Sequence, residues 1–362
     1  MALSKIPNAG ISDAVNFRNI IINGDMSIAQ RETSVTGVTN GGYYTCDRWR
    51  LSSNLGAFTL SQSTDVPSGQ GFANSFKMDC TTAEDTTTAV DTITLFSQRI
   101  EGQNLQYLKK GTSSAESLTA SFWVKSNKTG TYILEMYDTD NSRTISKSYT
   151  IDSASTWEKK TLTFVGDTTG AFGNDNGGSL RFNFWLGAGT FYSSGTLATS
   201  WQTYDNTDRA VGQVNLADST SNDFYITGVQ LEAGTTASDF EFLPVDVNLE
   251  RCQRYFELLK DETGETVICL AQGVGSTSVF GRIFFMTDKR AIPSGSVSDA
   301  GHFQVLTGSA AAWSTATGSS LGSGDLRSIR LTLTGLSGMT TGGCHELRIN
   351  DASGQVKIDS EL

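Results

Sequence analysis

The chain is poor in the residue types that build metal centres and covalent frameworks. It has five cysteines and only two histidines, His302 and His345, which are far apart in the sequence. The cysteines are odd in number, widely scattered and without a CxxC pair, which argues against a disulfide framework or a zinc site. We expect reduced, mostly buried thiols that behave as small hydrophobes: Cys46, Cys80, Cys252, Cys269 and Cys344.

Positive charge is also scarce. Lys and Arg total 27 against 38 Asp and Glu, a net charge of -11, with no block of like charge. This balance argues against a nucleic-acid partner held through phosphates and does not favour anionic membranes. No apolar run is long enough to span a bilayer, so we expect no membrane insertion. The opening MALSKIPNAG lacks the order of a signal peptide, and we expect folding in a cytoplasm.

Glycine is abundant and proline is rare, with 37 and 4 residues respectively. Together with Ser, Thr and Asn between short apolar runs, this composition predicts an all-β protein with many tight turns. At 362 residues the chain is long enough for two domains. The runs LTASFWVKS, TYILEMYD and RFNFWLG alternate with a period of two. Their spacing predicts a jelly-roll β-sandwich.

The stretch 224–256 organises the rest of the chain. It begins as a strand with one buried face, in which Gly228 marks a bulge or a close backbone approach. After Pro244 the apolar period becomes helical and predicts a helix over 247–260. We therefore predict an arm at 1–16, a jelly-roll domain at 17–243, a linker helix at 244–261 and a smaller C-terminal β-sandwich at 262–362.

Four motifs carry a family resemblance: IINGDMSIAQR, YYTCDRW, DFYITGVQLEAG and FEFLPVDVNLERCQRYF. In this order they resemble tail-fibre and other adsorption proteins of tailed bacteriophages. The NGDM opening and the ITGVQLE ending are also similar to the two ends of jelly-roll carbohydrate-binding modules. The resemblance implies a homotrimeric virion component with a carbohydrate-binding-like sandwich and a terminal domain exposed to the host. In such a component residues 1–16 would be the arm that attaches to other virion proteins; the alternative is a frayed end. The long shaft of extended fibres is missing, because no heptad or short repeat is visible.

Aromatic residues interrupt the polar faces of three predicted strands. Sugars stack on such rings while neighbouring polar groups bind their hydroxyls, so the mixture suits a glycan platform. The alternative is that the rings pack beneath the long loops or in a subunit interface. The candidate glycan-binding residues are Trp123, Lys125, Glu135, Tyr137, Arg181, Asn183 and Trp185.

Asp25 and Glu232 lie at the two ends of the predicted sandwich, where jelly-roll carbohydrate modules often hold a structural calcium ion. Calcium needs six to eight oxygen ligands, of which the sequence supplies two candidates. The alternative is turn chemistry for Asp25 and a salt bridge for Glu232.

The chain shows no motif that requires an enzyme. The clusters Asp138 with Asp140 and Asp205 with Asp208 could supply the two carboxylates of a glycosidase. Both clusters instead have the composition of Asx-rich turns. GxSxG, HExxH and P-loop motifs are absent from the sequence. We therefore expect a protein without catalytic residues.

The predicted helix has apolar residues around much of its circumference. Burial against the sandwich on one side and against symmetry mates on another would explain this distribution. Burial between two domains of one chain is the alternative. The candidate interface residues are Leu249, Cys252, Tyr255, Phe256 and Leu259.

These expectations combine into a short phage tail fibre or virion appendage that binds host-surface polysaccharide without catalysis. Repeated weak sites in a trimer would raise avidity through effective concentration. Two alternatives stay open: a capsid or tail decoration protein that binds no glycan, and a polysaccharide depolymerase.

Overall fold

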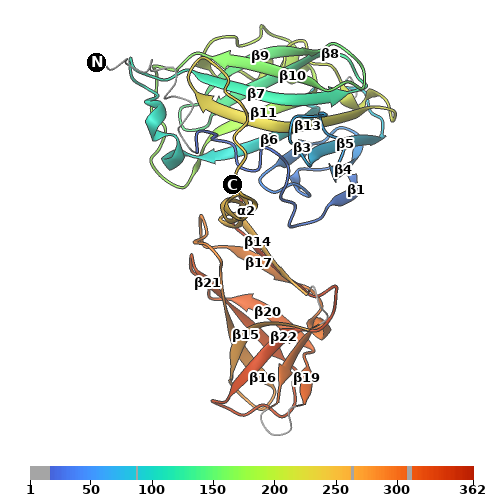
Figure 1. Ribbon diagram of the computed structural model, residues 1–362, viewed down its shortest axis with the longest axis vertical. Helices are drawn as coiled ribbons and strands as arrows, with labels where there is room; N and C mark the ends of the chain where they lie inside the picture. Colours follow the sequence, from blue (N-terminus) through green and yellow to red (C-terminus); the bar gives the residue numbers. More distant parts are fainter. Residues whose placement is uncertain (1–16, 87–88, 262–264, 308–311) are drawn as a thin grey trace, which may run out of the picture. The chain divides into compact units, whose positions relative to one another are not determined.

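The structure is a computed structural model that describes residues 17–86, 89–261, 265–307 and 312–362 (Figure 1). The arm predicted at 1–16 lies outside the described residues. The chain divides into two compact units, Met1–Asn248 together with Leu362, and Leu249–Glu361. The division falls within α2, which spans Val245–Gln253.

The first unit is a sandwich of two antiparallel sheets. The six-stranded sheet has the order β1-β4-β5-β13-β7-β10. Its strands are β1 (Ser34–Val38), β4 (Ala57–Ser63), β5 (Ser75–Thr82), β13 (Asp223–Ala233), β7 (Leu118–Ser126) and β10 (Glu158–Phe164). The seven-stranded sheet has the order β12-β9-β8-β11-β6-β3-β2. Its strands are β12 (Gln202–Thr203), β9 (Arg143–Ile151), β8 (Gly130–Asp138), β11 (Gly178–Ala188), β6 (Ile93–Glu101), β3 (Arg50–Ser53) and β2 (Gly42–Tyr43).

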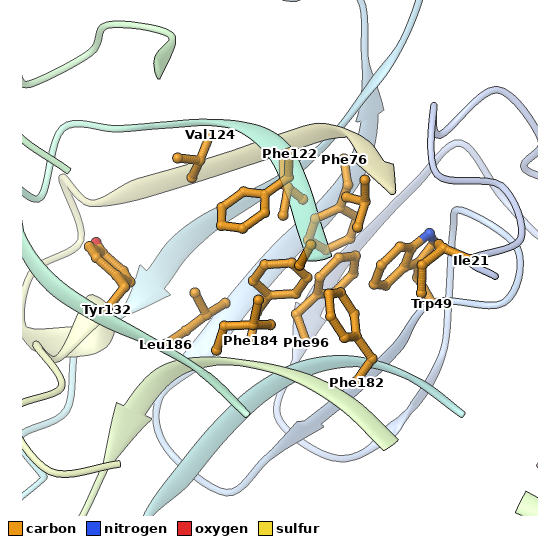
Figure 2. Packing of buried hydrophobic residues seen from close by; sticks show 14 of the residues in the cluster. Ile21, Trp49, Phe76, Phe96, Phe122, Val124, Tyr132, Phe182, Phe184 and Leu186 are labelled. Carbon is orange, nitrogen blue, oxygen red and sulfur yellow. The ribbon is translucent and has the colours of Figure 1, made fainter. Parts of the chain in front are cut away.

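The core lies between these two sheets and follows the period-two pattern. In β7, Ala120, Phe122 and Val124 are fully buried, as their alternation predicts. Figure 2 shows aromatic and aliphatic side chains of both sheets packed together. Phe122 of one sheet meets Phe184 of the other edge to face, with ring centroids 5.0 Å apart. Burying such rings removes large apolar areas from water and stabilises the sandwich.

Three of the quoted motifs meet in space. The indole Nε1 of Trp49 donates to the Asn23 carbonyl at 3.0 Å, and the Asn23 amide donates to the Asp47 carbonyl at 3.0 Å. The Val229 backbone N–H donates to the Gly24 carbonyl at 2.8 Å. A Cβ at Gly24 would lie 2.0 Å from the Val229 oxygen, so only glycine permits this approach.

The second unit also has two antiparallel sheets around one core. The three-stranded sheet consists of β14 (Phe256–Lys260), β23 (Gln355–Asp359) and β17 (Ser294–Val297). The seven-stranded sheet consists, in spatial order, of β19 (Trp313–Thr315), β18 (Phe303–Leu306), β22 (Cys344–Ile349), β15 (Thr266–Gly273), β16 (Ser278–Phe284), β21 (Ser328–Thr334) and β20 (Gly318–Gly322). The predicted all-β class is therefore confirmed.

Helices are few and short. Besides α2, the described residues form α1 (Thr190–Ser193) and the 3₁₀ turns η3 (Gly102–Asn104), η4 (Gln106–Leu108), η5 (Asn206–Asp208), η6 (Leu216–Asp218) and η7 (Ala300–His302). Among the described residues, no helix combines the length and the hydropathy of a membrane span. None of the five cysteines is in a disulfide: three are buried, Cys269 is intermediate and Cys344 is exposed.

The helix predicted over 247–260 is wrong in its second half. The helix ends at Gln253, and residues 256–260 form β14, which pairs with β23 from Phe256↔Asp359 to Lys260↔Gln355. The apolar positions fit both periods, and backbone pairing with a strand about 100 residues later decides between them.

Three of the predicted interface residues fit the alternative, burial within one chain, and contradict a subunit contact. Cys252, Tyr255 and Phe256 are 0%, 1% and 2% exposed, so the chain itself covers them and they offer no surface to another subunit. Leu249 and Leu259 are half-buried.

Candidate functional site

Three of the seven predicted glycan-binding residues form a closed network on the outer side of the seven-stranded sheet. Glu135, Asn183 and Trp185 are 0%, 2% and 0% exposed. Arg209 donates to both carboxylate oxygens of Glu135, at 2.6 and 2.9 Å. Asn183 and Trp185 donate to Oε2 at 2.9 and 3.1 Å, and Thr144 donates to Oε1 at 3.0 Å. The prediction of a glycan platform at these three positions is therefore wrong.

The segment 189–214 covers this network. Tyr192 of α1 lies with its ring centroid 5.3 Å from that of Trp185, and Arg209 follows η5 directly. Burial acts to raise the pKa of Glu135. The charge and hydrogen bonds of Arg209, together with hydrogen bonds from Asn183 and Thr144, outweigh burial and hold the pKa below its ordinary value. Such a buried, fully hydrogen-bonded ion pair anchors the segment to the sheet.

Tyr137 and Arg181 lie one row further along the same face and are half-buried. The two residues are opposite each other on β8 and β11, and the guanidinium carbon of Arg181 is 5.5 Å from the centre of the Tyr137 ring. Tyr204 packs against Tyr137, with the two ring centroids 4.6 Å apart. These two predicted residues keep a surface that solvent reaches.

The described part of the chain contains a pocket of about 320 Å³ on the outer face of the six-stranded sheet, and Trp123 lines it. Trp123 lies in β7 between Lys159 of β10 and Thr227 of β13. It is half-buried, whereas its strand neighbours Phe122 and Val124 point into the core. The lining consists of Gly69, Gln70, Phe72, Ser121, Trp123, Lys159, Gly228, Asp239, Phe240 and Phe242.

A triad of phenylalanines forms one wall of the pocket. The ring centroid of Phe72 is 5.1 Å from those of Phe240 and Phe242, which are 4.9 Å from each other. Phe242 is 49% exposed, so the wall is open to solvent. The Glu241 backbone N–H between the last two rings donates to the Gln230 side chain at 2.9 Å, which holds this segment against β13.

Gly228 gives the wall its close contact with the sheet. Its φ is +61°, and the pairing of β13 with β7 shifts register between Thr227 and Gln230, which confirms the predicted bulge. A Cβ at this position would lie 2.5 Å from the Phe72 ring. Glycine therefore permits both the left-handed backbone and the approach of Phe72.

Lys125 lies in a second row on this face, two residues from Trp123. Its ammonium group is 4.1 Å from the centre of the Tyr225 ring and pairs with Asp65. Trp157 donates to the same carboxylate at 3.0 Å. Burial acts to raise the pKa of Asp65, and hydrogen bonds from Lys125 and Trp157 lower it further than burial raises it. Lys125 thus holds Asp65 and the Tyr225 ring together beside the pocket.

The predicted calcium ligands do not fit a cation. Asp25 accepts from Ser27 and Asn248 at 3.1 and 3.2 Å. Glu232 accepts from the backbone and hydroxyl of Ser238 at 2.8 and 2.7 Å, and its carboxylate is 3.6 Å from Arg18. Both carboxylates face separate sets of donors, whereas a calcium site brings oxygen ligands together. Within the described residues, no group of three or more His, Cys, Asp or Glu could hold a metal ion.

The acidic clusters are turns, as their composition predicts. Asp138 accepts from the backbone N–H groups of Asp140 and Asn141 at 2.9 and 3.1 Å. Asp205 accepts from the Thr207 backbone at 2.9 Å and caps η5. The backbone hydrogen bonds show that these carboxylates organise loops. The other oxygen of Asp138 is 2.5 Å from the Lys110 ammonium group, and both side chains are buried.

The sequence interpretation missed most of the pocket. Three lining residues come from connections between strands: Phe72, Phe240 and Phe242. Lys159 comes from a strand whose pairing with the strand of Trp123 was not predicted. One signal was present: the FEF triplet places two aromatic rings in a connector, where no core alternation requires them.

Neither a protein-family model nor a curated protein matches the chain. Among solved structures, bacteriophage CBA120 tailspike protein 4 is similar with a TM-score of 0.34 and 14% identity over 60% of this chain, which spans 22% of the tailspike structure. The family 11 carbohydrate-binding module from Clostridium thermocellum, in complex with a mixed-linked tetrasaccharide, gives 0.26 and 13% over 56% of this chain and 98% of the module.

The tandem CBM22-1–CBM22-2 domain of Paenibacillus barcinonensis Xyn10C gives a TM-score of 0.27 and 9% identity over 96% of this chain and 98% of the tandem domain. These values are low, and a function for this chain has to come from its own residues.

Proposed function

We propose that the pocket around Trp123 binds a glycan, and that the chain is a non-catalytic attachment component of a tailed-phage virion. The observation that carries the glycan assignment is the pocket itself: an indole, three phenyl rings and several polar side chains line one cavity. Sugar rings present apolar C–H faces and hydroxyl edges, which this combination matches. The phage assignment is supported by the resemblance of the sequence motifs.

The pocket supports binding more than hydrolysis. Among the described residues that line it, Asp239 is the one carboxylate. A retaining or inverting glycosidase uses two carboxylates at a set separation. Incubation with host-envelope polysaccharide should therefore release no reducing sugar, and measurable release would overturn the non-catalytic assignment.

A glycan array with the whole chain tests the binding. Trp123→Ala should weaken binding of the recognised glycan by about 2 kcal/mol, the value expected of a central aromatic anchor. Phe242→Ala should weaken it as well, and because Phe242 is 49% exposed this variant should fold normally. Tyr107→Ala is the matched control, since Tyr107 is 50% exposed and lies outside the pocket. An unchanged profile for both pocket variants would overturn the proposal.

Self-association into a homotrimer is supported by the resemblance and by apolar side chains exposed in the second unit. Leu270, Phe284 and Met286 are 65%, 73% and 76% exposed, which is typical of surfaces that meet another protein. Size-exclusion chromatography with light scattering should report three times the mass of 38.9 kDa. A monomeric mass would remove the avidity argument.

Location on the virion is part of the same proposal. A density map of the intact particle should place this chain in the adsorption apparatus. A position elsewhere on the head or tail, without glycan binding, would identify a decoration protein instead.

A further inference from the structure

Three arginines come together on the outer face of the seven-stranded sheet, outside the aromatic pocket. Arg181 of β11 lies directly opposite Arg99 of β6. Arg50 of β3 lies opposite Ser97 of β6. Ser97 precedes Arg99 by two residues, so Arg50 lies on the same sheet face as Arg99. All three side chains are half-buried.

This arrangement carries an electrostatic penalty within the protein. Like charges directly opposite on neighbouring strands repel each other. Arg209, on the same sheet face, has a carboxylate partner in Glu135, whereas Arg50, Arg99 and Arg181 form no ion pair among the described residues. The chain has 38 acidic and 27 basic residues, so it contains enough carboxylates to pair with these arginines. An unpaired cluster in such a protein indicates a partner outside the chain.

The surroundings of the cluster disfavour positive charges that lack a counter-ion, and they provide a ring beside the cluster. Burial lowers the pKa of Arg181 and of Arg50, and the charge of Arg99 lowers both further. Tyr137 lies against Arg181 at 5.5 Å, and a phenol ring beside a guanidinium offers both a stacking surface and a hydroxyl. Guanidinium groups donate in a planar fork that matches carboxylate and sulfate oxygens. Partial exclusion of water makes these contacts stronger than at an open surface.

We propose that Arg50, Arg99 and Arg181 bind the anionic group, a carboxylate or a sulfate ester, of an acidic polysaccharide. The saccharide character of the ligand rests on the proposed function, whereas the preference for a negative charge follows from the arginines. Because the cluster and the Trp123 pocket belong to different sheets, the chain has two separate contacts, one for sugar rings and one for acidic substituents.

Calorimetric titration of the whole chain with three polymers tests the proposal: polygalacturonate, dextran sulfate and neutral dextran. Arg99→Gln and Arg181→Gln should each weaken binding of an acidic polymer at least about tenfold, the loss expected when one charged hydrogen-bonding partner is removed. Arg327→Gln is the control with the same charge change, since Arg327 is exposed in the second unit and pairs with Asp288. Preference for polygalacturonate or for dextran sulfate identifies the anionic group.

Two results would overturn the proposal. The first is no binding of either acidic polymer at low salt. The second is an equal loss for all three variants, which would show that net charge alone attracts the polymers. Trp123→Ala should leave binding of the acidic polymers intact, so failure of the glycan pocket and failure of the arginine site are distinguishable.

Thermal stability at low ionic strength separates binding from a structural role. Arg99→Gln should raise the melting temperature, because it removes repulsion with Arg181. A lower melting temperature together with unchanged binding would show that the cluster supports the fold, and would overturn the proposal.

Discussion

The indole Nε1 of Trp185 donates a hydrogen bond of 3.1 Å to Oε2 of Glu135, 50 residues earlier in the chain. Arg209, which lies 74 residues after Glu135, donates to the same carboxylate. Three distant parts of the chain therefore meet in one buried polar network. This network explains why two strands with polar outer faces do not form a binding surface at these positions.

Replacing Glu135 by Gln should destabilise the first unit strongly. The substitution leaves the buried Arg209 without its counter-charge, and breaking a buried pair in this way costs about 3–5 kcal/mol. Urea denaturation should show this loss as a lower midpoint. Glu116→Gln is the control, because Glu116 pairs with Lys109 at the surface and such pairs contribute about 0–1 kcal/mol. Equal losses for the two variants would contradict a structural role for the network.

The stability contributed by Glu135 should depend on pH. Its pKa in the folded protein is below the ordinary value of 4.5, so the unfolded chain binds the proton more readily. The contribution is complete above the ordinary pKa and is lost as the pH falls through the lower, folded value. The melting-temperature gap between the wild type and Glu135→Gln should thus be constant near neutral pH and narrow in acid. A gap that widens on acidification would refute this sign.

Gly228→Ala should disturb the aromatic wall of the pocket. Both Gly228 and Gly37 have a positive φ, of 61° and 70°, so alanine at either position carries the left-handed penalty of about 1–2 kcal/mol. Only at Gly228 does the new Cβ meet a neighbour, the Phe72 ring at 2.5 Å. Gly228→Ala should therefore lose more unfolding free energy than Gly37→Ala and should also weaken glycan binding. Equal effects would show that Phe72 moves freely.

Thiol labelling should proceed in separate phases. Cys344 is exposed, whereas Cys46 and Cys252 are 2% and 0% exposed, and burial raises the pKa of the Cys46 thiol well above its ordinary value. Since the thiolate is the reactive form, the native protein should label first at Cys344. A Cys344→Ser variant should lose the fast phase. Persistence of that phase would place another thiol at the surface.

Two features could not be predicted from the sequence: most of the pocket lining, and the strand that takes the place of the second half of the predicted helix. Trp123 was found because it interrupts the polar face of β7, but Phe72 and Phe240 reach the pocket from connections that have no periodic pattern. Residues 256–260 fit a helical and a strand period equally, and pairing with β23 selects the strand. Both decisions depend on contacts between residues far apart in the chain, which local periodicity does not encode.

The sequence by itself determined the all-β class, the faces of β7, β8 and β11 and the bulge at Gly228, because side-chain direction alternates with every residue of a strand. Only the tertiary structure decided which outward-facing rings stay accessible. Trp123 and Trp185 both lie on the outward-facing sides of their strands. Trp123 lines an open pocket, whereas Trp185 lies under the segment 189–214. The difference arises because a long connection packs over one sheet face and brings Arg209 to Glu135, a contact that depends on the folded chain as a whole.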